Sequence, residues 1–339
     1  MSSCDKIILP DLAADCPFKW SVNPHYERAR DESCAWIESF KVFTDRKGAL
    51  FKIYNSELLA ALTYPYAGFE EIRTCCDFIN LLFVFDEISD ELNGVEAREL
   101  GVIVLKALNG TYTKGSVMSK MSEEFRDRFL KKASPKCLER FIAHCANYIL
   151  AVSREAGLRK DGEVLDLANY MTLRRENSAV QTCFALFEYI HGIDLPDEVF
   201  ENPVFMRMYW QGIDAVCLSN DLYSFSMERA KGLDGNNFVT VAMREKRMGI
   251  QEAADYTAAE FTARVAKFLE DEKALPSFGS DIDVGVQKYV FSITQWVIGN
   301  IMWSFDTPRY FGVHHDEVKK TRVVYVKNRG DDADAHLLD

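Results

Sequence analysis

Residues 210–228, WQGIDAVCLSNDLYSFSME, decide the fold, because an apolar run passes here into a regular row of polar groups. Asn220, Ser224 and Glu228 follow one another at steps of four. Such steps keep side chains on one helix face, since the α-helix has about 3.6 residues per turn. The face offers an amide oxygen, a hydroxyl oxygen and a carboxylate, hard donors of the kind that Mg²⁺ prefers. The stretch therefore predicts a long helix that carries metal ligands.

A second candidate metal face is the acidic cluster at residues 86–91, which ends the helical pattern of residues 69–90. Asp86 and Asp90 share a helix face, where like charges repel, and near a helix C-terminus they also oppose the helix dipole. The apolar residues 81–85 place these acids at the end of a buried helix. A solvated acidic helix end would explain the cluster by itself. Together, the two faces predict a metal clamp for a diphosphate.

The rest of the chain has the same helical character. It has 339 residues, of which 48% are hydrophobic, enough for a large core. No linker, repeat or low-complexity block precedes the last dozen residues, so we expect one all-α bundle. Asn23-Pro24 is interpreted as a helix start. Val323–Val326 is strand-like but is discounted. The predicted helices span about 23–43, 69–90, 95–108, 122–154, 162–191, 197–229, 250–272 and 282–303.

Charge and cysteine usage limit the partners and the compartment. The net charge of −12 argues against nucleic acid and anionic membrane as partners, although metal ions could still attract an anionic substrate. Nine scattered cysteines without a Cys-x-x-Cys pair predict reduced thiols in a cytoplasmic protein. Neither a signal peptide nor an uncharged run of about 18 residues occurs, so we expect no membrane insertion.

Two arginine segments could bind phosphate oxygens. Arg174 lies between apolar segments, and Arg309 and Tyr310 lie in a loop after an apolar helix. A guanidinium group binds phosphate oxygens with two parallel hydrogen bonds and keeps its charge. A surface ion pair with Glu176 is the alternative for Arg174, and the second segment is a weak signal by itself.

These pieces together resemble the class I terpene synthases, particularly the single-domain fungal sesquiterpene cyclases of mushroom type. Asp86-Glu87-x-x-Asp90 is similar to the first metal motif of that family. Asn220-Asp221-Leu222-x-Ser224-x-x-x-Glu228 matches the second metal motif at every defined position. Arg174 stands where the family keeps its diphosphate-sensing arginine, and Arg309-Tyr310 matches the late Arg-Tyr pair. The resemblance covers about residues 15–315.

The resemblance implies one terpene synthase domain over residues 1–339, with a central cavity and with residues 1–20 and 327–339 flexible. It implies three Mg²⁺ ions that trigger departure of diphosphate from farnesyl diphosphate, after which the carbocation cyclises or is quenched. The implied metal ligands are Asp86, Asp90, Asn220, Ser224 and Glu228. The implied catalytic residues are Asp86, Arg174, Arg309 and Tyr310, and the implied diphosphate-binding residues are Arg174, Lys231, Arg309 and Tyr310.

One departure from the family concerns Met227, where many members have a lysine that contacts diphosphate. Lys231 or Arg229 could replace it. Phe83, Phe184 and Trp303 are predicted to form an aromatic cavity wall that stabilises the carbocation, with ordinary core packing as the alternative.

Other functions remain as alternatives. A monoterpene synthase acting on geranyl diphosphate, or a former of acyclic alcohols, would carry the same motifs. A chain-elongating prenyltransferase would show two Asp-rich motifs. A di-iron bundle would need a second Glu-x-x-His pair beside Glu188 and His191. A non-catalytic helical interaction protein would not need complete metal motifs. No motif encodes the product skeleton, and both a monomer and a homodimer are consistent with the sequence.

Overall fold

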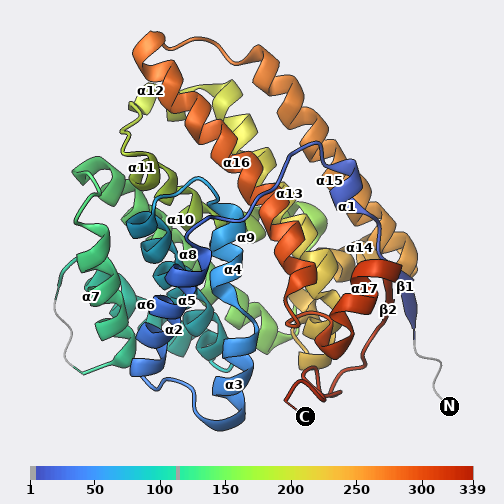
Figure 1. Cartoon of the computed structure of the whole chain (residues 1–339). Coiled ribbons are helices and arrows are strands. Elements are labelled where there is room, and N and C mark those ends of the chain that lie inside the picture. The colour runs from blue at the N-terminus through green and yellow to red at the C-terminus, as the bar shows by residue number, and fades with distance from the viewer. Residues whose placement is uncertain (1–4, 112–114, 339) are drawn as a thin grey trace.

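The computed structural model describes residues 5–111 and 115–338, and helices make up nearly all of their regular structure (Figure 1). This confirms the predicted all-α class. The helices are α1 (Leu12–Asp15), α2 (Tyr26–Ser39), α3 (Asp45–Ile53), α4 (Ser56–Thr63), α5 (Phe69–Ser89), α6 (Gly94–Leu108), α7 (Val117–Phe129), α8 (Pro135–Asp161), α9 (Leu167–Asn177), α10 (Val180–Phe184), α11 (Leu186–His191), α12 (Asp197–Glu201), α13 (Pro203–Lys231), α14 (Phe238–Lys246), α15 (Ile250–Ala274), α16 (Ser280–Asp306) and α17 (His315–Thr321). Two 3₁₀ turns, η1 (Asp234–Asn236) and η2 (Gly312–His314), and two short strands, β1 (Lys6–Ile8) and β2 (Val323–Tyr325), complete the chain.

Helix α13 forms the centre of the bundle and packs against both α15 and α16. Nearly every residue from Gly212 to Met227 is buried, which is typical of a core helix. The Asn202 side chain accepts hydrogen bonds from the amides of Val204 and Phe205, and Pro203 occupies the first helical position. This start directs the apolar part of α13 through the core and places the polar row in its last turns.

Several predicted helices are divided in the structure. The predicted helix 122–154 is two helices, because Ser134 caps α8 and Pro135 begins it. The predicted helix 162–191 is three, with a break after α9 where Ala179 has a φ of 60°. The predicted helix 197–229 is divided at Asn202 into α12 and α13.

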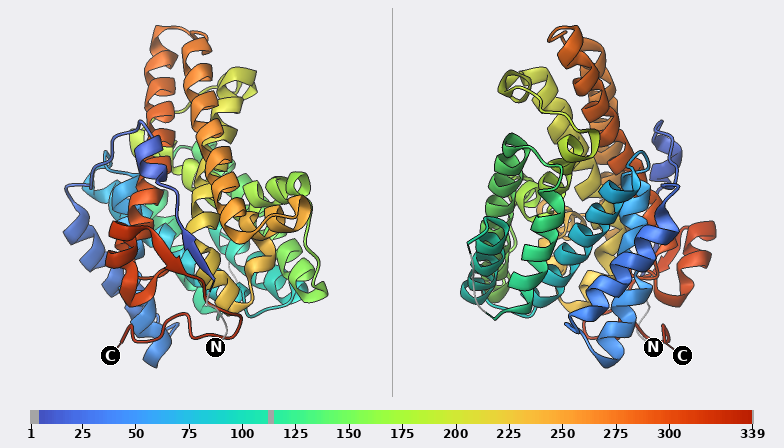
Figure 2. Two further views of the ribbon diagram at one scale, coloured as in Figure 1. Left: turned by 90° about the vertical axis from the view of Figure 1, so that its right-hand side faces the viewer. Right: turned by 60° about the vertical axis from the view of Figure 1, so that its left-hand side comes forward.

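The strand signal at residues 323–326 was wrongly discounted. β2 pairs antiparallel with β1, and Ile7 lies opposite Val324. Tyr54 donates a hydrogen bond of 2.6 Å from Oη to Asp334 Oδ1, which ties the C-terminal segment to α3. The first and the last described segments of the chain lie at the same end of the molecule (Figure 2). Flexibility of residues 1–20 and 327–339 stays a prediction.

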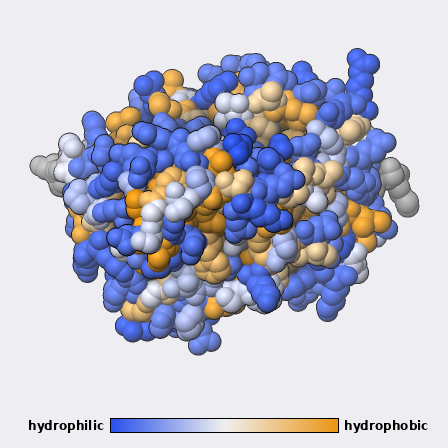
Figure 3. Space-filling model, turned by 90° about the horizontal axis from the view of Figure 1, so that it is seen from above, coloured by the Kyte–Doolittle hydropathy of each residue, from blue (hydrophilic) through white to orange (hydrophobic). Residues whose placement is uncertain are grey.

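The polarity of the surface and the state of the described cysteines are as the charge and the cysteine spacing of the sequence predict. Figure 3 shows a mostly hydrophilic face with scattered apolar areas. None of the described helices is long and apolar enough to cross a membrane. The eight cysteines in the described ranges are free thiols, and seven of them are buried.

Replacing Gly299 by alanine is expected to destabilise the bundle. Gly299 lies on α16 where this helix crosses α4, and an added Cβ would lie 2.5 Å from the carbonyl oxygen of Leu62. Backbone atoms must move to relieve such a contact, so we expect a loss of about 2 kcal/mol in the free energy of unfolding, measured by urea denaturation. Gly157→Ala on α8 is the control, because its Cβ would meet nothing within 4 Å. It is expected to be neutral or stabilising, and equal losses in both variants would contradict the prediction.

Candidate active site

A cavity enclosed by α4, α5, α8, α9, α10, α13 and α16 has one apolar and one polar end. The apolar end is lined by Leu59, Ile79, Leu82, Phe83, Val180, Val216, Trp296 and Trp303. The polar end is lined by Asp86, Asp90, Glu155, Arg174, Asn220, Ser224, Glu228, Lys231, Arg309 and Tyr310. The structure therefore brings both candidate metal motifs and all four predicted diphosphate-binding residues to one cavity.

The C-terminal end of α5 supplies crowded carboxylates. Burial raises the pKa of Asp90 to about 8, and the nearby charges of Asp86 and Glu155 act in the same direction. Burial also raises the pKa of Asp86. Glu87 is different, because Arg309 and Lys231 overcome the effect of burial and lower its pKa. A cation at Asp86 and Asp90 would relieve their repulsion.

Arg309 and Tyr310 connect the two motifs. Arg309 Nη1 donates to Glu87 Oε1 at 2.9 Å, and its Nη2 lies 3.7 Å from Asp86 Oδ2. Tyr310 Oη accepts a hydrogen bond of 2.8 Å from Asn220 Nδ2. Two adjacent loop residues thus contact the metal motif of α5 and that of α13, so they can respond to anything that binds between the two helices.

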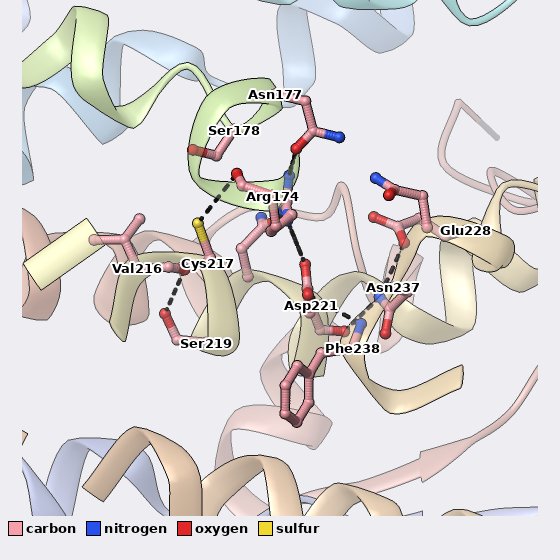
Figure 4. Close-up of polar contacts among 12 residues, drawn as sticks. Arg174, Asn177, Ser178, Val216, Cys217, Ser219, Asp221, Glu228, Asn237 and Phe238 are labelled. Carbon is pink, nitrogen blue, oxygen red and sulfur yellow. Dashed lines mark hydrogen bonds and ion pairs between the residues drawn. The ribbon is translucent and has the colours of Figure 1, made fainter. Parts of the chain in front are cut away.

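The row on α13 faces the cavity, as predicted. Asn220 Oδ1 accepts a hydrogen bond of 2.7 Å from Arg174 Nη2. Glu228 Oε2 accepts one of 2.9 Å from Asn237 Nδ2 (Figure 4). Burial and the neighbouring Asp221 raise the pKa of Glu228 to about 7. Ser224 lies one turn from each of the other two residues. Its hydroxyl oxygen is buried and accepts no hydrogen bond from the described residues.

This donor set fits a divalent metal ion. The Ser224 hydroxyl lies in the row between an amide and a carboxylate, and its lone pairs are not used by the described residues. The described residues contain no group of three or more His, Cys, Asp or Glu side chains that could hold a metal. An ion at the row of Asn220, Ser224 and Glu228 would be bound by amide, hydroxyl and carboxylate oxygens and would complete its shell with water or phosphate oxygens, as is typical of Mg²⁺.

Arg174 is held in place by Asp221, a defined position of the second motif to which the sequence analysis assigns no role. Arg174 Nε donates to Asp221 Oδ1 at 2.9 Å, and Nη1 lies 3.5 Å from Asn177 Oδ1 (Figure 4). Tyr170 and the amide of Phe238 donate to Asp221 Oδ2. Asp221 thus orients the guanidinium group, which also donates to Asn220 of the row.

Two charged residues of α8 were missed by the sequence analysis. Glu155 Oε2 accepts a hydrogen bond of 2.6 Å from Asn177 Nδ2, which connects α8 to the end of α9. Arg159 Nη2 donates to the carbonyl oxygens of Ser89 and Asp90 at 3.3 and 3.2 Å. An arginine at the last carbonyls of a helix offsets the negative end of its dipole. No periodic signal links α8 to these distant residues.

Of the three aromatic residues predicted to line the cavity, two do so and one does not. Phe83 and Trp303 line the cavity and pack edge to face, with ring centroids 5.7 Å apart. Phe184 requires a correction, because its ring is fully buried behind the cavity against Phe187 and Tyr209. The space left by Gly212 of α13 is filled chiefly by Ile293, and the Phe184 ring is in ordinary van der Waals contact with this position.

Glu188 and His191 have contacts away from the cavity. Arg140 Nη1 donates to Glu188 Oε1 at 2.7 Å, and His191 Nε2 lies 2.9 Å from Ser292 Oγ. Neither residue lines the cavity in the described part of the chain. Their contacts explain the Glu-x-x-His pattern as a part of the helix packing.

The fold and the cavity together define a class I terpenoid synthase architecture, and comparisons with known proteins agree. The family described as "Terpene synthase family 2, C-terminal metal binding" matches residues 77–267. The solved structure of an α-eudesmol synthase superposes with a TM-score of 0.78 at 23% identity, covering 86% of this chain and 98% of that one. At this identity the likeness speaks for the fold alone.

Relatives that match over most of their length show the family to which the chain belongs. The bifunctional terpene synthase Agr4 of Cyclocybe aegerita is 46% identical over 95% of this chain and 93% of its own length. A protein of Coprinopsis cinerea named linoleate 10R-lipoxygenase COP4 is 47% identical over 94% and 92%. That name refers to an oxygenase, whereas the family match and Agr4 agree on terpene chemistry. The chain belongs to the terpene synthase family, which implies a prenyl diphosphate substrate and a divalent metal.

Proposed function

We propose that the protein is a Mg²⁺-dependent sesquiterpene synthase that ionises farnesyl diphosphate. The observation that carries this proposal is the single cavity in which two oxygen-rich helix faces meet an apolar, aromatic end. A diphosphate fits between the oxygen-rich helix faces, and a hydrocarbon chain fits the apolar end. A sesquiterpene synthase of Cyclocybe aegerita, Agr5, is 40% identical over 90% of this chain and 72% of its own length, which supports a C15 substrate.

The metal ligands follow from the two motifs. Asp86 and Asp90 would hold ions on one side, and Asn220, Ser224 and Glu228 on the other, for three ions in all. When bound, these ions neutralise the charge that grows on the departing diphosphate.

The cationic side chains must exchange partners when diphosphate binds. In the structure Arg174 donates to Asn220 and Asp221, and Arg309 donates to Glu87. A diphosphate carries more charge than either partner and accepts paired hydrogen bonds from guanidinium groups. We expect both arginines to turn to it, so that they stabilise the leaving group as the C–O bond breaks.

Lys231 supplies the cation that Met227 does not. Lys231 lines the cavity, and its Nζ lies 3.7 Å from Glu87 Oε1. Arg229, the other candidate, lies 3.9 Å from Asp5 Oδ2 and does not line the cavity in the described part of the chain. Lys231, one turn after Met227, therefore takes the role of the lysine in the family motif.

The apolar end has to protect the carbocation. Phe83, Trp296 and Trp303 line this end, where their rings can attract a cation and their apolar surface excludes water.

Incubation with prenyl diphosphates tests the proposal. Purified protein is given farnesyl or geranyl diphosphate with Mg²⁺ or with EDTA, and products are identified by gas chromatography–mass spectrometry. We expect a Mg²⁺-dependent C15 product from farnesyl diphosphate. A C10 product from geranyl diphosphate alone would favour a monoterpene synthase. Absence of product and of pyrophosphate release from both substrates would contradict the proposed function.

Replacing Arg159 by alanine is expected to weaken metal binding without abolishing turnover. Arg159 touches the backbone that carries Asp90, and residues that support metal ligands typically contribute about tenfold to metal affinity. We expect the Mg²⁺ concentration for half-maximal activity to rise about tenfold, while kcat recovers at saturating Mg²⁺.

Hydrogen–deuterium exchange of the Arg159→Ala protein adds a readout independent of activity. Amides 86–92 of the metal-free protein are expected to exchange faster, because the end of α5 loses its cap. Arg154→Ala, an exposed residue on the same helix, is the control. An unchanged Mg²⁺ requirement in Arg159→Ala would show that the cap does not position the metal ligands.

A further inference from the structure

Asn300 places an amide beside the apolar end of the cavity. It lies on α16 between Trp296 and Trp303, both of which line the same cavity, and only 4% of its surface is exposed. Placing an amide in apolar surroundings costs free energy unless its polar atoms have partners. The hydrocarbon chain of a substrate offers no hydrogen-bond partner. A polar atom of this amide that the protein leaves unpaired therefore needs a partner from another molecule.

The hydrogen bonds of Ser219 fix the orientation of this amide. Ser219 Oγ donates its single proton to the carbonyl oxygen of Val216 at 3.0 Å (Figure 4). Toward Asn300 it can therefore only accept, and it does so from Nδ2 at 3.0 Å. A flipped amide would require the Ser219 hydroxyl to turn toward Oδ1 and to give up its hydrogen bond to Val216. The NH₂ group of Asn300 is thus held at Ser219, and Oδ1 remains as the free acceptor.

Oδ1 of Asn300 has no hydrogen-bond partner within residues 5–111 and 115–338. It is also not among the fully enclosed, unsatisfied atoms of those ranges. Because Asn300 lines the cavity, this oxygen has access to the cavity space. A water molecule held there would lie beside the aromatic residues of α16.

We propose that Asn300 Oδ1 anchors a water molecule that quenches the carbocation, so that a terpene alcohol is part of the product. This inference rests on the proposed function, which supplies the cation. The water oxygen forms a C–O bond to the cationic carbon, and no oxidant is needed. The proton that the new oxonium loses passes to the released diphosphate, the base that ionisation creates in the same cavity. Asn300 determines specificity between alcohol and hydrocarbon.

The test compares Asn300→Ala and Asn300→Leu with the wild type at saturating Mg²⁺ and farnesyl diphosphate. Products are measured by gas chromatography–mass spectrometry in water enriched in ¹⁸O, and pyrophosphate release is measured in the same reactions. We expect ¹⁸O-labelled alcohol from the wild type. Loss of one hydrogen bond should lower the alcohol share about tenfold in both variants, while pyrophosphate release stays within about threefold.

Two further variants separate orientation from packing. Ser219→Ala frees the amide to rotate and should lower the alcohol share by a smaller factor, about threefold. Ser304→Ala removes a neighbouring buried hydroxyl of α16, which donates to the backbone carbonyl of Asn300, and should leave the alcohol share unchanged.

The outcomes are distinguishable. An equal alcohol share in the wild type and in Asn300→Ala, or hydrocarbons alone from a wild type that releases pyrophosphate, overturns the role of Asn300. A wild type that releases no pyrophosphate from any prenyl diphosphate overturns the proposed function instead.

Discussion

Replacement of Asn220 and Glu228 together by alanine is expected to abolish Mg²⁺-dependent turnover. Both side chains face the cavity from α13, and the change leaves the Ser224 hydroxyl as the last member of the row. One hydroxyl cannot hold a divalent ion, which needs several oxygen ligands. We expect a loss of at least about 10³-fold in kcat, equivalent to about 4 kcal/mol of transition-state stabilisation.

Circular dichroism and metal-induced stabilisation distinguish this effect from unfolding. The helical signal of Asn220→Ala/Glu228→Ala should match the wild type, because the core contacts of α13 come from its apolar residues. The rise in melting temperature on adding Mg²⁺ and pyrophosphate should disappear. The control is Glu99→Ala/Asn109→Ala, which changes an exposed residue of α6 and the exposed C-cap residue that follows this helix. Retained turnover would show that the row is not a metal site.

The fold class was predictable because periodic apolar spacing is a local property that repeats along every long helix. The helix ends were predicted less well, because one signal can have several causes. Ser134-Pro135 starts α8 and was overlooked. Asn23-Pro24 has the same form, yet α2 begins at Tyr26. Asn23 donates instead to the carbonyl oxygens of Tyr64 and Ala67 and fixes a loop. Tertiary contacts decide between such uses.

The candidate site was predictable where its residues lie on one helix face, as Asn220, Ser224 and Glu228 do. Contacts between distant helices were not. Asp221 holds Arg174 from another helix, and nothing in the spacing of either segment indicates this pair. The misplaced Phe184 has the same cause, because whether an aromatic residue faces a cavity or the core depends on its neighbours in space. Asn300 was missed for a related reason, since a single buried amide has no pattern.

Asp86→Asn is the second change with a large expected effect. Asp86 lines the polar end of the cavity, and its Oδ2 lies 3.7 Å from Arg309 Nη2. An asparagine keeps the size and one acceptor oxygen, so the fold and the contact with Arg309 should remain. It removes the negative charge that the metal ion needs as a counter-charge. We expect kcat to fall about 10²- to 10³-fold.

The matched control for Asp86→Asn is Glu91→Gln, which removes an equal charge from the end of the same acidic cluster. Glu91 forms an exposed ion pair of 2.7 Å with Lys47 and does not line the cavity in the described part of the chain. Exposed ion pairs contribute little, so its turnover and stability should stay close to the wild type. If both variants lose activity equally, the cluster acts through its overall charge. If Asp86→Asn retains normal turnover at limiting Mg²⁺, Asp86 is not a metal ligand, and the first motif must act through Asp90 and its neighbours.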